Sequence, residues 1–584
     1  MKGKGFRVFN NMQEGHKVLI LSLVVGLSCG LAAVLLSKLI SLIQHFLSTT
    51  VAPSSPTLLY LIFPGLGMLI SLLLVRYVVK DNIGHGVTKV LVAVSRNESS
   101  IKPHNMWSSI LTSSVTIGFG GSVGAEAPIV YTGAALGSNF ARWAHLSHRS
   151  RTILLGCGAA GAVAGIFKAP LAGVLFTLEI LLFNISMASM MPLLVSTVSA
   201  TMVSYLLLGD SLPFQCTLTA FSMGNVPFYV VLGILCGLVS LYFIRLTLHL
   251  EDRMGEMRSP WLRWALCAVA LGLLIFLFPP LFGEGYSSLG VLLNGGEVSL
   301  DGQTPLAGML HSGWGVPVFF LLILLLKVFS MTLTNAGGGV GGTFGPTLFM
   351  GAIAGFVVAR CLNLMGVGVP EQNFVLVGMA ALMAGVMQAP MTAIFLIAEI
   401  SGGYELFIPL IVAAACSFGT VRLFERYSIY TKRIAQTGEL LTHDNDQAVL
   451  TLLKTADLVR DKYPRISADL TLGEFVDVIS DSDAQVFAVL DASSHLLGIV
   501  EMDHVRKLMF KTDEYPTTYV RDFMEAPQSV VQVEDKMESV MGKFDRTQAW
   551  RLPVVDGDGI YLGFLSKSRI MSAYREELKE ISQD

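Results

Sequence analysis

Gly124-Ala-Glu-Ala-Pro128 and Gly342-Thr-Phe-Gly-Pro346 are two glycine-rich segments, each ending in proline, that lie 218 residues apart in apolar surroundings. A second pair repeats at nearly the same spacing, since Ala169-Pro170 and Glu179-Ile180 recur 220 residues later as Ala389-Pro390 and Glu399-Ile400. Two matched blocks at almost one offset predict two similar halves. Halves built from interrupted helices are typical of transporters and channels, whose binding site lies between them near the middle of the membrane.

The composition divides the chain into a membrane part and a soluble tail. Of the 584 residues, 53% are hydrophobic and 14% are charged, whereas about 25% are charged in an ordinary soluble domain. Residues 451–584 hold 24 acidic and 16 basic residues, while the first 450 hold 19 and 24. This distribution excludes a wholly soluble enzyme and a disordered chain. The seven cysteines lack paired spacing, so we expect neither a disulfide framework nor a metal site.

The apolar part contains both uninterrupted and broken stretches. A spanning helix needs about 20 apolar residues, and the stretches that pass this test are 18–37, 58–75, 180–208, 227–244, 264–282 and 374–398. Glycine and proline break the apolar stretches 117–136, 154–178 and 333–356. Unpaired backbone groups are tolerated in a membrane only where protein or water covers them, so we predict half-length helices there. Basic residues before the first stretch predict a cytoplasmic N-terminus, and the length of that stretch predicts a retained span.

The two glycine-rich segments have the chemistry of an anion site. Glycine lets the backbone approach a ligand, and proline fits the first turn of a helix. A helix N-terminus carries free N–H donors and roughly half a positive charge. Two such termini meeting at the midplane bind a small anion weakly enough to release it, as conduction requires. Gly84-His85-Gly86 is a candidate for a third terminus.

Glu126 is an acid among small apolar residues, which makes it a functional candidate in a membrane. Where an anion binds, an ionised carboxylate competes with it, and a protonated one leaves the site. We therefore expect Glu126 to be a gate and a candidate proton carrier. The alternative is a buried acid that only satisfies neighbouring N–H groups.

Four further side chains suggest more than one role. Glu179 and Glu399 occupy matching positions, which favours a structural role over a direct one in transport. Lys327 is expected to snorkel or pair, and Tyr430 either offers its hydroxyl to an anion or is an interfacial aromatic residue.

From about residue 455 the sequence changes to short apolar runs and charged amphipathic stretches. Residues 486–491 and 496–500, followed by a helix from Met502, predict one strand–strand–helix unit. Residues 551–556 and 561–565, followed by a helix from Lys567, predict another. The tail is therefore expected to be a soluble α/β tandem.

The chain resembles the CLC family of chloride channels and proton–chloride exchangers over essentially its whole length. Residues 121–128 are similar to that family's G(K/R)EGP segment and residues 341–346 to its GGxFxP segment; Gly283-Glu-Gly-Tyr286 and residues 169–173 also fit. The resemblance implies an α-helical polytopic membrane protein, a homodimer with one pore per subunit. Each pore is built from two inverted halves with broken helices, and the tail is a cytoplasmic α/β pair of CBS domains.

The resemblance also implies roles for individual residues. Glu126 matches the gating glutamate, and Tyr430 matches a tyrosine whose hydroxyl contacts the central anion. Thr343 and Phe344 match the positions whose backbone N–H groups hold that anion. The remaining expected anion-site residues are Gly84, His85, Gly86, Gly124, Ala125 and Gly342.

Three departures from the family pattern bear on mechanism. His85 stands where the family usually has a serine or proline, so selectivity for chloride over related anions is open. Ile180 stands where many proton-coupled members have an inner glutamate, and Ala125 replaces the basic residue of the gating segment. Ile180 favours channel-like flow gated by Glu126; the alternative is a proton-coupled antiporter with another inner proton path.

The expected division of the chain follows from these patterns. It runs as a cytoplasmic segment 1–17, a membrane domain 18–435, a linker 436–454 and CBS domains 455–511 and 517–577. Arg569 and His504 stand where nucleotide-binding CBS pairs commonly carry an aspartate, so a purely dimerising tail is one alternative and adenine nucleotide binding is the other. The expected partners are chloride or similar anions, protons as an alternative, a second subunit and the cell membrane; no cofactor and no nucleic acid is expected.

Three other function classes fit less well. A CBS-bearing divalent-cation transporter needs several acids converging on a pore, and its magnesium flux separates it from an anion pathway. An intramembrane enzyme needs a His-Glu-x-x-His, Ser/His or paired-Asp arrangement. A signalling receptor leaves the glycine-rich repeat unexplained.

Overall fold

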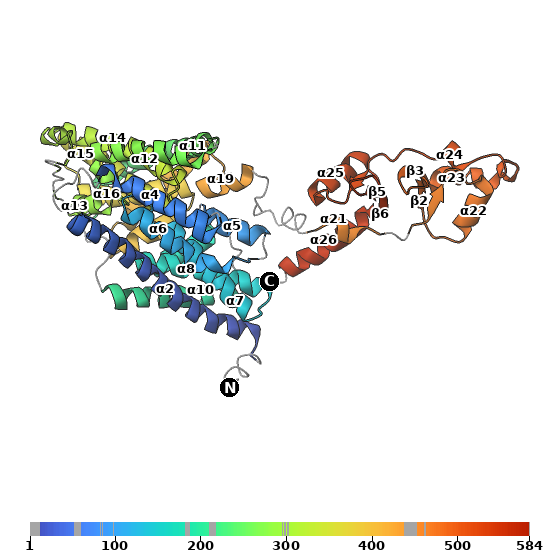
Figure 1. Ribbon diagram of the computed structural model, residues 1–584, viewed down its shortest axis with the longest axis horizontal. Helices are drawn as coiled ribbons and strands as arrows, with labels where there is room; N and C mark the ends of the chain where they lie inside the picture. The colour runs from blue at the N-terminus through green and yellow to red at the C-terminus, as the bar shows by residue number, and fades with distance from the viewer. Residues whose placement is uncertain are drawn as a thin grey trace. The chain divides into compact units, whose positions relative to one another are not determined.

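The computed structural model describes residues 12–51, 60–81, 83–84, 86–96, 99–181, 187–209, 218–257, 259–294, 296, 300, 303–436, 453–460 and 463–582. The chain forms two compact units, Met1–Leu440 and Leu441–Asp584, each described by itself (Figure 1). Most of the expected linker, residues 437–452, lies outside the described residues.

The regular secondary structure in the described part of the first unit is helical, apart from a bridge between Gly124 and Gly342. Its helices are α2 (Glu14–Phe46), η1 (Leu47–Val51), α4 (Phe63–Leu73), η2 (Leu74–Val79), α5 (Gly86–Arg96), η3 (Pro103–Met106), α6 (Ser108–Gly118), α7 (Glu126–Trp143), α8 (His148–Phe167), α9 (Pro170–Glu179), α10 (Met187–Leu208), η4 (Met223–Asn225), α11 (Val226–Gly255), α12 (Pro260–Leu277), η5 (Pro279–Leu281), α13 (Tyr286–Leu293), η6 (Ala307–His311), α14 (Gly315–Ala336), α15 (Phe344–Leu364), α16 (Glu371–Met387), α17 (Pro390–Ile400), α18 (Phe407–Arg422) and α19 (Ile429–Gln436). Among the described residues, seven helices are long and apolar enough to cross a membrane.

Half-length helices are present, but the broken stretches predict only part of them: α9 lies largely within 154–178, whereas 117–136 and 333–356 fall mainly in α7, α14 and α15, which have 18 to 22 residues. α5, α6 and α17 have 11 residues and α9 has 10. At about 1.5 Å per residue each spans about 15 Å, half of a hydrocarbon core of about 30 Å. A helix of this length cannot cross the hydrocarbon core by itself.

One predicted span is wrong. The stretch 374–398 was expected to form a single helix, but it is divided between α16 and α17. Gln388 adopts a left-handed conformation with φ 52°, and Pro390, which lacks an N–H, starts the second helix. The same break occurs in the first half, where Lys168 (φ 56°) separates α8 from α9.

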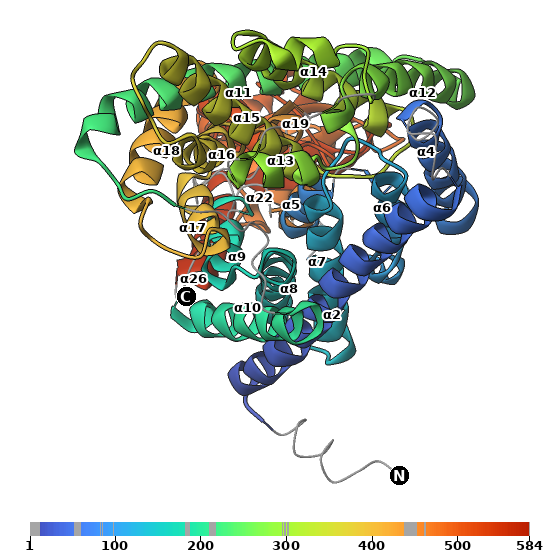
Figure 2. The same ribbon diagram turned by 90° about the vertical axis from the view of Figure 1, so that its left-hand side faces the viewer.

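The two halves pack in matching ways. α7 packs against α8 in the first half, and α15 packs against α16 in the second. In Figure 2, α2, α7, α8 and α10 occupy the lower part of the unit and α11, α14, α15 and α16 the upper part. α9 and α17 contact each other where the halves meet. Small residues permit the closest helix packing, since a Cβ on Gly133 would lie 2.1 Å from the carbonyl oxygen of Gly158.

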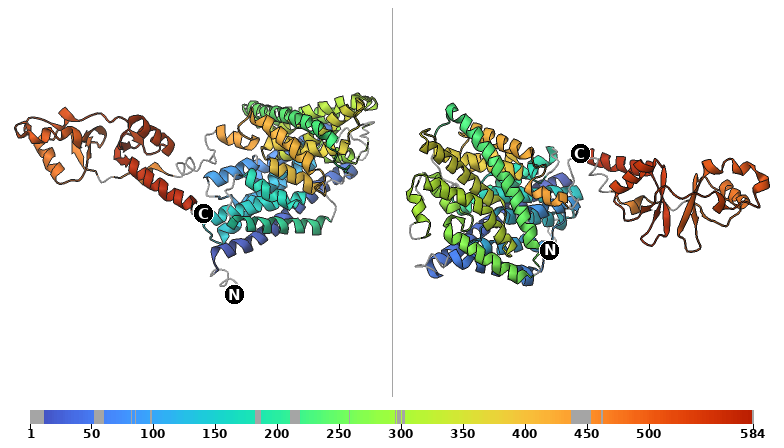
Figure 3. Two further views of the ribbon diagram at one scale, coloured as in Figure 1. Left: turned by 180° about the vertical axis from the view of Figure 1, so that it is seen from behind. Right: turned by 90° about the horizontal axis from the view of Figure 1, so that it is seen from above.

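The second unit contains two three-stranded sheets, which Figure 3 shows side by side in its right-hand view. The first sheet has the order β1 (Arg465–Ser467), β2 (Val486–Leu490), β3 (Leu496–Glu501), and the second has β4 (Val531–Gln532), β5 (Arg551–Val555), β6 (Tyr561–Ser566). β1 pairs with β2, and β4 with β5, in parallel. The hairpins β2–β3 and β5–β6 are antiparallel. The helices of this unit are α21 (Thr455–Leu458), α22 (Leu472–Ser480), α23 (Met502–Val505), η7 (Leu508–Phe510), η8 (Thr512–Glu514), α24 (Val520–Phe523), α25 (Met537–Thr547) and α26 (Lys567–Ser582).

Both predicted strand–strand–helix units of the tail are confirmed. β2 and β3 lead into α23, and β5 and β6 lead into α26. The two sheets share one apolar cluster made of Val486, Ala488, Leu490, Ile499, Tyr561 and Phe564. Each sheet therefore buries one face against the other.

Candidate anion-binding site

The two glycine-rich segments meet directly. Gly124 and Gly342 exchange both backbone hydrogen bonds, at 3.0 Å from Gly124 N to Gly342 O and 2.7 Å in the reverse direction. α7 begins two residues after Gly124 and α15 begins two residues after Gly342. The short bridge therefore places two helix N-termini next to each other, as the repeat predicts.

The carboxylate of Glu126 lies at the N-terminus of the opposite helix. Its Oε2 accepts a hydrogen bond from the backbone N–H of Gly345, in the first turn of α15, at 3.1 Å. Its Oε1 accepts one from the Tyr286 hydroxyl at 2.7 Å. The residue is 3% exposed. A carboxylate here occupies the position that the N–H groups and dipole of α15 offer to an anion.

Tyr430 lies beside the same terminus. It is buried on α19, and its hydroxyl oxygen accepts a hydrogen bond from the Thr343 hydroxyl at 3.2 Å. Thr343 is the residue that precedes Phe344 at the start of α15. The structure thus brings Thr343, Phe344 and Tyr430 to one place.

The third glycine segment also reaches this region. α5 begins at Gly86, where a Cβ would lie 2.4 Å from the carbonyl oxygen of Ala127 in α7. Gly84 has φ 48°, which favours glycine. His85 lies outside the described residues. The start of α5 is therefore packed against the first turn of α7.

The contact of the segment 283–286 with Ala125 and Glu126 was not predicted from the sequence. Gly285 has φ 85°, and this turn precedes α13. Glu284 Oε1 accepts a hydrogen bond from the backbone N–H of Ala125 at 3.0 Å, while Tyr286 binds Glu126. The family-like motif of residues 283–286 was visible in the sequence, but its position against α7 is a tertiary contact.

Lys327 does not snorkel; neutral hydrogen-bond acceptors hold its amine in the interior. Its side chain is fully buried on α14, and Nζ donates to Ser122 Oγ at 2.8 Å and to the carbonyl oxygen of Gly283 at 3.2 Å. It also lies 4.9 Å from the centre of the Phe349 ring. The buried amine of Lys327 thus lies next to the segments that carry Glu126 and Glu284.

Glu179 and Glu399 bind helix termini instead of the site. The carboxylate of Glu179 accepts N–H bonds from Met391 and Thr392 at 3.0 and 2.7 Å. That of Glu399 accepts N–H bonds from Leu171 and Ala172 at 3.0 and 2.9 Å. Ile180, next to Glu179, is buried and carries no ionisable group.

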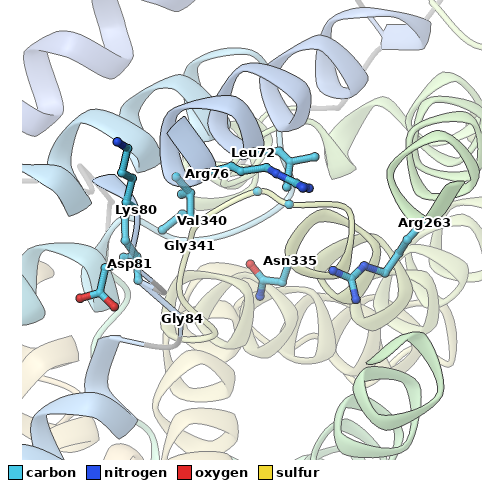
Figure 4. A pocket seen from close by; sticks show the side chains of 13 residues that line it. Leu72, Arg76, Lys80, Asp81, Gly84, Arg263, Asn335, Val340 and Gly341 are labelled. Carbon is cyan, nitrogen blue, oxygen red and sulfur yellow. The ribbon is translucent and has the colours of Figure 1, made fainter. Parts of the chain in front are cut away.

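A cavity of about 620 Å³ lies beside the loop that leads into α15 (Figure 4). Arg76, Lys80 and Arg263 supply positive charge to its wall, and Asp81 supplies a negative charge. Gly84 and the loop 338–341 complete the wall close to the glycine segments. Bases outnumber acids here, so the wall carries a net positive charge.

In the second unit, a cavity of about 690 Å³ is lined by residues of both repeats, including 482–486 and 501–503 from the first and 547–551 from the second. Polar residues such as Asp503, Arg506 and Ser566 line it. His504 stands where nucleotide-binding CBS pairs commonly carry an aspartate. Its ring nitrogen Nδ1 lies 3.1 Å from the Glu525 carboxylate. Nucleotide binding in the tail therefore stays a prediction.

Comparisons with known proteins agree with this architecture. The family model described as voltage gated chloride channel matches residues 66–422, and the CBS domain model matches residues 520–576. A putative chloride channel protein ClcB-like of Ralstonia nicotianae is 26% identical over 430 residues, covering 71% of this chain and 96% of the relative. The voltage-gated ClC-type chloride channel ClcB of Escherichia coli is 29% identical over 332 residues, covering 56% and 75%.

Solved structures show the same fold. A slow cyanobacterial Cl⁻/H⁺ antiporter superposes with a TM-score of 0.62 at 22% identity, covering 72% of this chain and 97% of that one. A eukaryotic CLC transporter superposes with a TM-score of 0.59 at 18% identity, covering 94% and 97%. The chain therefore belongs to the voltage-gated chloride channel (CLC) family and carries a CBS domain in its tail.

Proposed function

We propose that this protein conducts chloride and related small anions through a pore formed by helix N-termini, that Glu126 gates it, and that the flow is channel-like. The observation that carries the proposal is the contact of the Glu126 carboxylate with the N–H of Gly345 at 3.1 Å. A side-chain anion in that position blocks the place where a transported anion binds.

The proposed cycle follows from charge. Ionised Glu126 binds at the start of α15 and excludes chloride. Protonation removes the negative charge, so the side chain leaves and an anion takes its place. The backbone N–H groups of Thr343 and Phe344 and the Tyr430 hydroxyl then hold it. Gly124, Ala125 and Gly342 shape the opposite wall, and Gly84 and Gly86, at the start of α5, contribute the third terminus. Because no base in this set binds the anion directly, release stays fast.

The names of the relatives support chloride as the substrate, since the proteins of Ralstonia and Escherichia are described as chloride channels. One solved structure with 22% identity is described as a fluoride/proton antiporter. We therefore keep related small anions in the proposal.

Proton-coupled antiport is the second candidate. Glu126 is buried beside a second acid, Glu284, and a buried base, Lys327, which is a set of groups able to hold protons. Ile180 weighs against this candidate, because it leaves the usual inner proton position without an acid.

The remaining proposals concern the whole protein. We propose a homodimer in the cell membrane, with the N-terminus and tail in the cytoplasm. The proposed domains are a membrane domain at 18–435 and CBS domains at 455–511 and 517–577.

The test is purified protein in liposomes with an imposed chloride gradient, recording chloride efflux and proton movement together. Chloride flux without proton movement supports the channel, and uphill proton movement supports the antiporter. Glu126→Gln is expected to abolish the response of the flux to pH. An unchanged pH response in this variant contradicts gating by Glu126.

A further inference from the structure

Glu126, Glu284 and Lys327 form a cluster of two acids and one base. The proposed cycle uses only Glu126. Glu126 and the residue before it, Ala125, are each held by the turn 284–286. Tyr286 donates to the Glu126 carboxylate at 2.7 Å, and Glu284 accepts from the Ala125 N–H at 3.0 Å. One carboxylate is therefore carried by the first residue of α7, Glu126, and the other, that of Glu284, is bound by the backbone N–H of the preceding residue, Ala125.

Lys327 is the base of this cluster. Its ammonium group is tied to the same turn through the carbonyl oxygen of Gly283, at 3.2 Å, and to Ser122 Oγ, at 2.8 Å. Ser122 is held in turn by Ser330, whose hydroxyl donates to it at 3.0 Å, and by the carbonyl oxygen of Leu281, which it binds at 2.7 Å. Lys327 is thus a positive charge that cannot turn away to solvent.

The charges of the cluster are unbalanced. The titratable and charged groups that act on the two carboxylates are Lys327 from α14, Tyr286 from α13 and Tyr430 from α19. With both acids ionised and one ammonium group, the cluster carries a net negative charge away from bulk water. Two like charges in such a place are costly, and one bound proton makes the cluster neutral.

We propose that Glu284 and Glu126 act as an acid pair that takes up one proton as the pH falls, with Lys327 as the counter-charge. While neither acid holds the proton, Glu126 is ionised and closes the site. When Glu126 takes up the proton, Glu284 stays ionised, Lys327 neutralises it and the gate is free to leave. Glu284 is thus a positioning residue that sets the pH at which the gate opens. This inference rests on the proposed gating by Glu126.

The variant Glu284→Gln tests the pair, because the amide oxygen still accepts from the Ala125 N–H while the charge is lost. With Lys327 left unopposed, the ionised form of Glu126 becomes more favourable, so the gate takes up a proton only at lower pH. We expect anion flux in liposomes to persist and its pH midpoint to move toward acid by about one pH unit. Lys327→Met is expected to move the midpoint in the opposite direction. Glu405→Gln, at an exposed acid, is the matched control.

The outcomes separate this inference from the proposed function. If Glu284→Gln keeps the wild-type pH profile while Glu126→Gln loses it, the acid pair is wrong and gating by Glu126 stands. If Glu126→Gln keeps the wild-type profile, the proposed gating and the pair both fail. A second readout needs no flux: infrared difference spectra across neutral pH should show one protonated carboxyl group that disappears in Glu284→Gln. Spectra identical to the wild type overturn the pair even if a variant transports poorly.

Discussion

Glu179 and Glu399 cap each other's helices: Glu179 at the end of α9 binds the first turn of α17, and Glu399 at the end of α17 binds the first turn of α9. The two half-length helices therefore run in opposite directions, as inverted halves require. Each carboxylate also meets the positive end of the helix that it caps. This exchange fastens the two halves to each other.

Replacement of these caps should destabilise the membrane unit. Glu179 accepts three hydrogen bonds, including one from the Thr392 hydroxyl at 2.7 Å, whereas Glu399 accepts two. Hydrogen bonds to charged groups contribute about 1.5–3 kcal/mol, so each Gln variant should lose about 1–3 kcal/mol, with Glu179→Gln the larger loss. Thermal unfolding of the purified protein in detergent measures this. Equal stability of Glu179→Gln and the exposed control Glu405→Gln would contradict the capping role.

The contact of Gly124 with Gly342 leads to a second prediction. A Cβ on Gly342 would lie 2.7 Å from the Ala127 Cβ and 3.0 Å from its backbone nitrogen. Because backbone cannot yield cheaply, Gly342→Ala should separate the two helix termini. We expect a loss of about 1–3 kcal/mol in stability and slower anion flux. Gly419→Ala, on α18 where a Cβ meets open space, is the control for both assays. A Gly342→Ala protein with normal flux and unfolding temperature would show that the close bridge is dispensable.

Much of the fold could be predicted because it depends on local chemistry. The offset between the Gly124 and Gly342 segments predicts two halves, and the structure joins those segments. The break at Gln388 was missed even though Ala389-Pro390 had been recognised as part of the repeat. The stretch 374–398 is long and apolar enough for one spanning helix, and this length alone led to the prediction. In the structure, the left-handed conformation of Gln388 ends the first helix and Pro390 starts the second.

The surroundings of Glu126 could not be predicted from the sequence. Glu126 stands out as an acid in apolar sequence, but Glu284 lies 158 residues away and contacts Ala125 only through folding. The sequence is equally consistent with a Lys327 side chain that extends to the membrane surface. Ser122 and Gly283, which hold it inside, come from two distant segments. Such clusters arise from tertiary packing, which carries no periodic signal.

The basic cavity should speed anion entry. Arg76, Lys80 and Arg263 line it, and Asp81 pairs with Lys102 at 2.8 Å and His104 at 3.1 Å. Neutralising Arg76 with Gln lowers the local anion concentration, so anion flux should fall several-fold at low ionic strength. Because salt screens this attraction over about 10 Å at 0.1 M, the difference should shrink in high salt. Flux at two salt concentrations tests this, with Lys38→Gln on the exposed face of α2 as the charge-matched control. A loss that is the same at both concentrations would point to a steric effect instead.

Acid should weaken the second sheet of the tail through Asp535. Partial burial raises the pKa of the Asp535 carboxyl, but hydrogen bonds from Lys543 Nζ at 2.6 Å and the Gln532 N–H at 2.9 Å outweigh it, and the net pKa lies below its ordinary value. The folded state therefore favours the carboxylate. Its stabilisation is present above the ordinary pKa of about 3.9 and is lost as the pH falls through the lowered value.

Asp535→Asn should remove this contribution, which we expect to be about 1 kcal/mol at neutral pH. Hydrogen exchange of the β4–β6 amides in the full-length protein measures it. The variant should exchange faster than the wild type at pH 7, and the two should converge as acid protonates the wild-type carboxyl. Asp558→Asn, at an exposed turn residue, should follow the wild type at every pH. If both variants behave alike, the bond of Asp535 to Lys543 does not stabilise the sheet.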